Sequence, residues 1–193
     1  MVLIVSVAAS TLIALLRGGR LSRLASLRVE FGWLALAAVA LQYPLVYNLV
    51  AEATIIGVPL VTLMMVVSCA LVVCVVWANR RLPGVFLVGL GLLANLVVMT
   101  LNGGWMPITP EALQRMGRLS WVTPRGTVAK VWGAKNVALP RAETRLWWLS
   151  DILVLGPPLS LPTAFSLGDV LIAAGLFWLL QEALVGRSAA VQE

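Results

Sequence analysis

Residues 55–78 read IIGVPLVTLMMVVSCALVVCVVWA, a run of apolar side chains without a single charge. About 20 apolar residues in a helix are enough to cross the hydrocarbon core of a bilayer. The composition of the whole chain agrees, since 61% of its residues are hydrophobic, 11% are charged and the mean hydropathy is +0.98. Soluble domains are about half apolar and about a quarter charged, so the sequence predicts an integral membrane protein.

Four further apolar runs flank this segment and are suited to helices of similar length. Together with it they predict an all-α, polytopic membrane protein in which residues 1–193 form a single transmembrane domain. The five expected spans lie at about residues 2–16, 31–50, 55–78, 83–101 and 165–185. Residues 102–164 are then the one long segment outside the expected spans.

Residues 102–164, here called the outer segment, are expected to form one long extracytoplasmic loop, of which residues 115–132 lie on the membrane surface. Its one predicted element is a short interfacial helix, because Thr109 is a good N-cap, Pro110 suits the first helical position and Gly117 provides a stop. Tryptophans gather at the headgroup level of membranes. An aromatic belt is therefore expected from Trp105, Trp121, Trp132, Trp147 and Trp148.

The arginines of the short connections indicate the orientation in the membrane. Short loops that carry positive charge stay on the cytoplasmic side. With five spans, the arginines of the first loop, the third loop and the tail fall on one side; they are Arg17, Arg20, Arg23, Arg28, Arg80, Arg81 and Arg187. We therefore expect a multi-pass protein of the cell (inner) membrane, with its N-terminus outside and its C-terminus cytoplasmic. A cleavable signal peptide is not expected, because the basic cluster follows the first apolar run instead of preceding it.

Two carboxylates lie where the outer segment leads into the last expected span. A carboxylate at a bilayer boundary is costly, so each one needs a structural partner or a task. Ser166 and Asp169 have the spacing of a helix capping box, which would make Asp169 a cap; a catalytic role and a pairing with a basic residue are the alternatives. For Asp151, a salt bridge to Arg141 or Arg145 is the simplest interpretation.

Composition excludes several kinds of chemistry. The chain has no His, which excludes catalysis through an imidazole. Cys69 and Cys74 lie within an expected span, where packing is their simplest role, so neither a disulfide framework nor a Cys/His zinc site is predicted. No metal and no cofactor is expected. Nucleic acid is not an expected partner of an outer segment, despite the net charge of +6.

Several short motifs occur in an order and spacing that resemble a known family. They are RGGRLS after the first span, NRRLPG between the third and fourth, NGGWMP followed by PEAL, then TRLWWLSD and FSLGDVLIA. Over nearly the whole chain they resemble an uncharacterised family of bacterial multi-pass membrane proteins, catalogued as a domain of unknown function. The resemblance implies a small prokaryotic membrane protein and supplies no activity.

A local resemblance carries chemistry. The stretch WLSDILVLGPPLSLPTAFSLGDVLIAAGLFWLL is similar to the C-terminal part of lipoprotein signal peptidases, which are membrane aspartic proteases. The resemblance implies Asp151 and Asp169 as the catalytic pair, and the NGGWMP motif gives Asn102 a substrate-binding role. Two carboxylates that meet in a low dielectric share a proton, so one can act as base and the other as acid. The chain departs from that family at Ser166 and Gly168, where the family has Asn and Ala.

The outer segment is also rich in basic residues interleaved with tryptophan. They are Arg115, Arg118, Arg125, Lys130, Lys135, Arg141 and Arg145. Such a surface attracts the phosphates of anionic lipids or of a polyprenyl phosphate carrier, and the alternative is a solvated surface whose long side chains cover apolar neighbours. As candidate substrate-binding residues we name Asn102, Asn136, Arg141 and Arg145.

Three functions remain open at this point. The first is a structural or accessory membrane protein, or one that binds lipid headgroups. The second is a membrane-embedded aspartic hydrolase that uses Asp151 and Asp169 at the outer face. The third is a component of lipid-phosphate transport. The expected partners are membrane lipid and other membrane proteins, and the sequence leaves open whether the protein is an enzyme.

Overall fold

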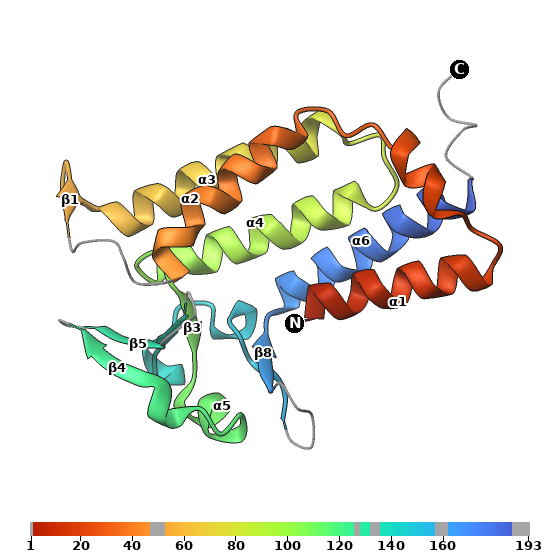
Figure 1. The fold of residues 1–193 in the computed structure, drawn as a ribbon. Helices are drawn as coiled ribbons and strands as arrows, with labels where there is room; N and C mark the ends of the chain where they lie inside the picture. Colours follow the sequence, from red (N-terminus) through yellow and green to blue (C-terminus); the bar gives the residue numbers. More distant parts are fainter. Residues whose placement is uncertain (1, 47–52, 126–127, 132–135, 157–161, 187–193) are drawn as a thin grey trace.

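A bundle of long helices with a small mixed α/β region at one end makes up the protein (Figure 1). The computed structural model describes residues 2–46, 53–125, 128–131, 136–156 and 162–186. The long helices within these residues are α1 (Val2–Leu16), α2 (Gly32–Val46), α3 (Leu60–Ala78), α4 (Val85–Leu101) and α6 (Leu167–Val185). A short 3-10 helix, η1 (Leu21–Ser26), connects α1 to α2.

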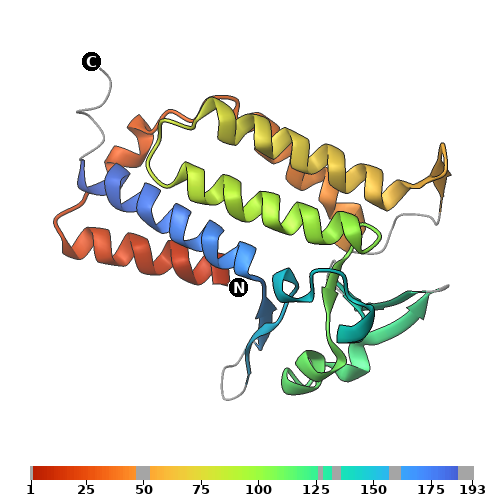
Figure 2. The same cartoon turned by 180° about the vertical axis from the view of Figure 1, so that it is seen from behind.

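The long helices pack side by side in the order α1, α6, α4, α3, α2 (Figures 1 and 2). The first and last helices of the chain are therefore neighbours, and they run parallel. The Ser6 hydroxyl donates to the Ala173 carbonyl at 2.8 Å, and the Ser10 hydroxyl donates to the Phe177 carbonyl at 2.9 Å. Both contacts join residues 167 positions apart, so the two helices keep one register along this stretch.

Helices α4 and α6 run antiparallel and approach each other at pairs of glycines. An ideal Cβ on Gly175 would lie 2.5 Å from the Gly84 carbonyl oxygen, and one on Gly168 would lie 2.7 Å from the Gly91 carbonyl oxygen. No side chain could fit between the two backbones at either point. Close approach at small residues is a common way for helices to associate in membranes, where water does not drive packing.

One end of the bundle, here named the basic end, collects the arginine-bearing connections. The Arg23 guanidinium donates to the last carbonyls of α6, at Leu184 (3.0 Å) and Val185 (2.6 Å). The Asn79 side chain, after the end of α3, pairs with the backbone N–H and carbonyl of Glu30, both at 2.9 Å. The start of α1 and the described residues between Met106 and Phe165 lie at the opposite end (Figure 1), which we call the domain end.

The outer segment folds into more than the expected loop with one short helix. Its strands β3 (Met106–Ile108), β6 (Asn136–Ala138), β5 (Val128–Val131) and β4 (Val122–Arg125) form one sheet in that order, with β3 and β6 parallel. A separate hairpin joins β7 (Leu153–Leu155) to β8 (Thr163–Phe165). The chain is thus mostly helical, and the all-α prediction fails for this segment.

Short helices complete the outer segment. They are α5 (Pro110–Arg115), η2 (Leu119–Trp121), η3 (Arg141–Glu143) and η4 (Trp147–Leu149). The first of these confirms the predicted short helix, since the Thr109 hydroxyl accepts the N–H of Ala112 at 3.2 Å and Pro110 occupies the first turn. Its Leu113 is fully buried against Ile108, Met116 and Val131.

A second buried cluster fastens the outer segment to the bundle. Trp105, Met106 and Val137 from the outer segment pack with Met65 of α3 and Met99 of α4. Trp105 is only 6% exposed, so its expected place in an aromatic belt is wrong; it anchors the sheet instead. The expected belt position of Trp132 lies outside the described residues.

The apolar runs expected as spans at 2–16, 83–101 and 165–185 agree closely with α1, α4 and α6. The run 31–50 agrees with α2 as far as residue 46, and residues 47–50 lie outside the described residues. The agreement is poorer for α3. This helix begins at Leu60 because residues 54–59 form a small hairpin of β1 (Thr54–Ile55) and β2 (Val58–Pro59), turned at Ile56 and Gly57 with φ of 53° and 76°. Among the described helices, α3 and α6 are long and apolar enough to cross a membrane, and α1 and α4 are shorter apolar helices. These lengths and compositions indicate membrane association.

Candidate functional site

Asp169 begins the last helix as part of a complete capping box. Its backbone N–H donates to the Ser166 hydroxyl at 3.0 Å, and its carboxylate accepts the Ser166 backbone N–H at 3.1 Å. These bonds satisfy N–H groups that the first turn of a helix would otherwise leave without partners. The predicted capping role of Asp169 is confirmed.

A third residue joins the capping box from the neighbouring helix. The Asn95 side chain of α4 donates to the other Asp169 carboxylate oxygen at 3.0 Å and accepts the Ser166 hydroxyl proton at 2.8 Å. We call this set of hydrogen bonds between Asn95, Ser166 and Asp169 the Asn95 ring. Gly168 makes it possible, because an added Cβ there would collide with the Asn95 side-chain oxygen.

Asp151 lies in the outer segment and is 8% exposed. Its carboxylate accepts the Asn136 side-chain N–H at 2.7 Å, and its backbone N–H donates to the Pro107 carbonyl at 3.1 Å. A parallel bridge pairs it with Ile108. The structure thus brings together Asp151 and Asn136, two of the predicted site residues, at the edge of the four-stranded sheet.

The β7–β8 hairpin relates the two acids to each other. Leu153 pairs with Phe165, so Asp151 precedes one strand and Asp169 follows the other at the same, open end of the hairpin. Their described hydrogen-bond partners are nevertheless different: Asn136 for Asp151, and Asn95 with Ser166 for Asp169. The arrangement gives each acid a structural role of its own.

Asn102 and Arg145 meet through the backbone. The Asn102 amide donates to the Val98 carbonyl at 2.7 Å and to the Arg145 carbonyl at 2.9 Å, and its side-chain oxygen accepts the Arg145 N–H at 3.0 Å. Asn102 therefore ends α4 and fixes the chain that leads into η4. The Arg145 side chain is exposed beside this clamp.

Several basic side chains lie over tryptophan rings. The Arg141 guanidinium carbon is 3.4 Å from the centre of the Trp147 ring, and that of Arg118 is 4.4 Å from the centre of the Trp121 ring. Arg141 is exposed, whereas Lys130, 4.2 Å above the Trp105 ring, is only 5% exposed. Cations attract the faces of aromatic rings, and the attraction grows where water is excluded.

The family comparison covers most of this structure. The model of a family of unknown function, DUF5317, matches residues 26–181. The chain belongs to this family. The match includes all three residues of the Asn95 ring, Asp151 and the Arg141–Trp147 pair, so the DUF5317 region contains every candidate site residue named above. A search of curated proteins and a search of solved structures each returned no match.

Asn95 is the site residue that the sequence did not single out. Lone amides in apolar helices commonly hydrogen-bond to a neighbouring helix, and Asn95 does so here. Its position four residues after Gly91, on a helix face of small residues, was the available signal. Within the described residues, no group of three or more His, Cys, Asp or Glu side chains is close enough to hold a metal ion.

Proposed function

We propose that this family member is a five-span protein of the inner membrane, an accessory protein whose outer segment binds the headgroups of anionic lipids. In this arrangement the N-terminus is outside and the C-terminus is cytoplasmic. Support comes from the direction of the long helices, which alternates along the chain through α1, α2, α3, α4 and α6 (Figures 1 and 2). The arginines of the basic end then face the cytoplasm, as the positive-inside rule requires.

Contact with lipid is supported by the outward faces of the helices. In α3, only 22% of the most apolar stretch is buried inside the protein, and in α6 only 39%. Large apolar side chains that point outward include Leu16 (80% exposed), Leu36 (73%) and Phe86 (74%). A helix this apolar at the core of a soluble protein would be mostly buried.

Headgroup binding rests on the Arg141–Trp147 pair at the junction of the bundle and the outer segment. Helix η4, which carries Trp147, packs against both α4 and α6, so the pair lies at the depth where headgroups would surround the bundle. The ring fixes the plane of the guanidinium. The described contact of Arg141 is with a ring and not with a carboxylate, which leaves its N–H groups for a phosphate.

Native mass spectrometry of the full chain in detergent tests this proposal. With added phosphatidylglycerol, Arg141→Gln is expected to weaken lipid binding roughly five-fold, the effect of about one basic residue near an anionic surface. Arg115→Gln, at an exposed arginine of α5, is the matched control and should change binding little. Equal binding by Arg141→Gln and the unaltered chain would exclude headgroup binding at this junction.

A membrane aspartic hydrolase is the second candidate. What favours it is the β7–β8 hairpin, which puts Asp151 and Asp169 at the same end of one element. If the two carboxylates share a proton during a reaction, either single change to Asn abolishes cleavage. The test is an assay on a lipid-modified peptide with Asp151→Asn and Asp169→Asn separately; activity that survives either change excludes the hydrolase.

A further inference from the structure

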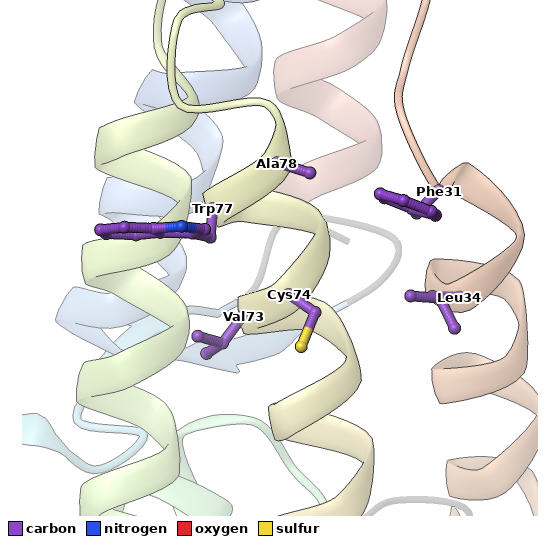
Figure 3. Close-up of a pocket in the computed structure, with 6 residues that line it drawn as sticks. All are labelled: Phe31, Leu34, Val73, Cys74, Trp77 and Ala78. Carbon is purple, nitrogen blue, oxygen red and sulfur yellow. The ribbon is translucent and has the colours of Figure 1, made fainter.

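The groove between α2 and α3 at the basic end has the shape and lining of a lipid site. It has a volume of about 500 Å³ and is lined by Phe31, Leu34, Val73, Cys74, Trp77 and Ala78. Figure 3 shows Phe31, in the turn before α2, and Leu34 of α2 projecting toward Cys74 and Ala78 of α3. We propose that this groove holds an acyl chain of an anionic phospholipid whose phosphate is bound by Arg80.

Hydrogen bonds join the α2 and α3 segments at both ends of the groove. At the basic end, the Asn79 side chain is tied to the Glu30 backbone at 2.9 Å. Deeper in the bundle, the Ser68 hydroxyl donates to the Ala38 carbonyl at 3.1 Å. Between these two ties lie the apolar lining residues of the groove, whose shape is therefore set by the protein itself. A preformed apolar site binds without the cost of ordering it.

Phe31 at the mouth of the groove has an unusual backbone. Its φ is 55°, a left-handed conformation that bulky residues rarely adopt. The turn starts α2 at Gly32 and directs the phenyl ring across the groove, where the ring remains 55% exposed. Strain of this kind persists where the surrounding structure fixes it, and it concentrates at ligand sites.

The charge at the mouth selects the headgroup. Arg80 lies 4.8 Å above the ring of Trp77, a lining residue, and one of its N–H groups donates to the Trp77 carbonyl at 3.0 Å. Arg28 and Arg81 are exposed in the adjoining connections. An acyl chain in the groove would bring its phosphate to these arginines, and a net negative headgroup is favoured over a zwitterionic one.

This inference rests on the membrane placement in the proposed function and on nothing at the domain end. Native mass spectrometry of the full chain with phosphatidylglycerol tests it with two kinds of variant. Ala78→Phe fills the groove and Arg80→Gln removes the charge, and each should weaken binding at this site roughly five-fold. Ala174→Phe, at an exposed alanine of α6, is the matched control for added volume and should bind as the unaltered chain does.

The Arg141→Gln variant distinguishes the groove site from the headgroup site at Arg141. In that background, adding Arg80→Gln should weaken the remaining phosphatidylglycerol binding by roughly a further five-fold, while binding of phosphatidylcholine stays the same. Lysophosphatidylglycerol should compete, whereas glycerol 3-phosphate, which has the phosphate but no acyl chain, should not. Unchanged binding in both Ala78→Phe and Arg80→Gln overturns the groove site. If Arg141→Gln alone removes the lipid, the headgroup proposal stands and the groove proposal fails.

Discussion

Replacing Asn95 by leucine is expected to lower the free energy of unfolding by about 1 kcal/mol, the usual range for a side-chain hydrogen bond between helices. The change leaves the Ser166 hydroxyl and one Asp169 carboxylate oxygen without their partner on α4. Unfolding of the detergent-solubilised chain by a denaturing detergent, followed by circular dichroism, measures the effect. Thr100→Leu, at an exposed polar residue of the same helix, is the control. Equal loss in both variants would show that the Asn95 ring contributes nothing specific.

Loss of the Ser166 hydroxyl should weaken both the start of α6 and its hydrogen bond to Asn95 of α4. Ser166→Ala is expected to cost about 1 kcal/mol, because the N–H of Asp169 loses its acceptor at the N-cap. Ser166→Thr retains a hydroxyl that can cap and should recover most of the stability. The same unfolding measurement tests this prediction. If Ser166→Thr is as unstable as Ser166→Ala, the Ser166 hydroxyl does not act as a cap.

For single residues, a contact could be predicted only when its two partners lie close together in the sequence. The capping box lies within four consecutive residues, so the spacing of Ser166 and Asp169 was enough to indicate it. The partner on α4 is more than 70 positions away, since Asn95 bonds to Asp169 across 74 residues. No local pattern encodes that distance. The same holds for Asp151 and Asn136, which the sequence named as site residues without predicting that they meet.

Among the helices, the contact of α4 with α6 depends on the absence of side chains at its glycines. Gly168→Ala is expected to destabilise the chain by about 1–3 kcal/mol, because the new methyl group would lie 2.7 Å from the Gly91 carbonyl oxygen. Gly32→Ala is the matched control, since its nearest neighbour would be 3.8 Å away. The free energies of unfolding of the two variants are compared in detergent. If Gly168→Ala is as stable as Gly32→Ala, the backbones of α4 and α6 are not in contact at Gly168.

Elements of the bundle could be predicted and elements of the outer segment could not. A membrane span needs a long apolar run, and such a run can be recognised in the sequence without knowing which helices pack against it. The strands of the outer segment are three or four residues long and include Pro107 and Pro124, so no alternating pattern marks them. Gly57 illustrates the limit as well. It lies within the apolar run 55–78 that was expected to form a span, yet it turns the β1–β2 hairpin with φ of 76°.

Over the whole molecule, the proposed topology makes a prediction about two exposed residues. In a chain with Cys69 and Cys74 replaced by Ala, Ile56→Cys should react with a membrane-impermeant maleimide added to intact cells. Ile56 is 97% exposed at the domain end, which is outside in this topology. Ser26→Cys, exposed in η1 at the basic end, should react only after the membrane is opened. The reverse pattern would mean the opposite orientation.

The proposed orientation rests on the arginines of single short loops, so it needs no tertiary structure, and it stays a prediction. The order of the helices in the bundle could not be expected in this way. Nothing in the first apolar run indicates that it packs against the last. That neighbour relation depends on Ser6 and Ser10 meeting carbonyls 167 residues further on.

The pairing of the first helix with the last has a consequence for how the protein is made. During synthesis α1 leaves the ribosome first, but its hydrogen-bond partners on α6 are translated only after the entire outer segment. Until then the hydroxyl of Ser10 lacks the Phe177 carbonyl and the Gln181 amide that it contacts in the finished protein. In the proposed topology, α1 therefore stays in the membrane without its neighbour until α6 is made and packs against α1 and α4 at once.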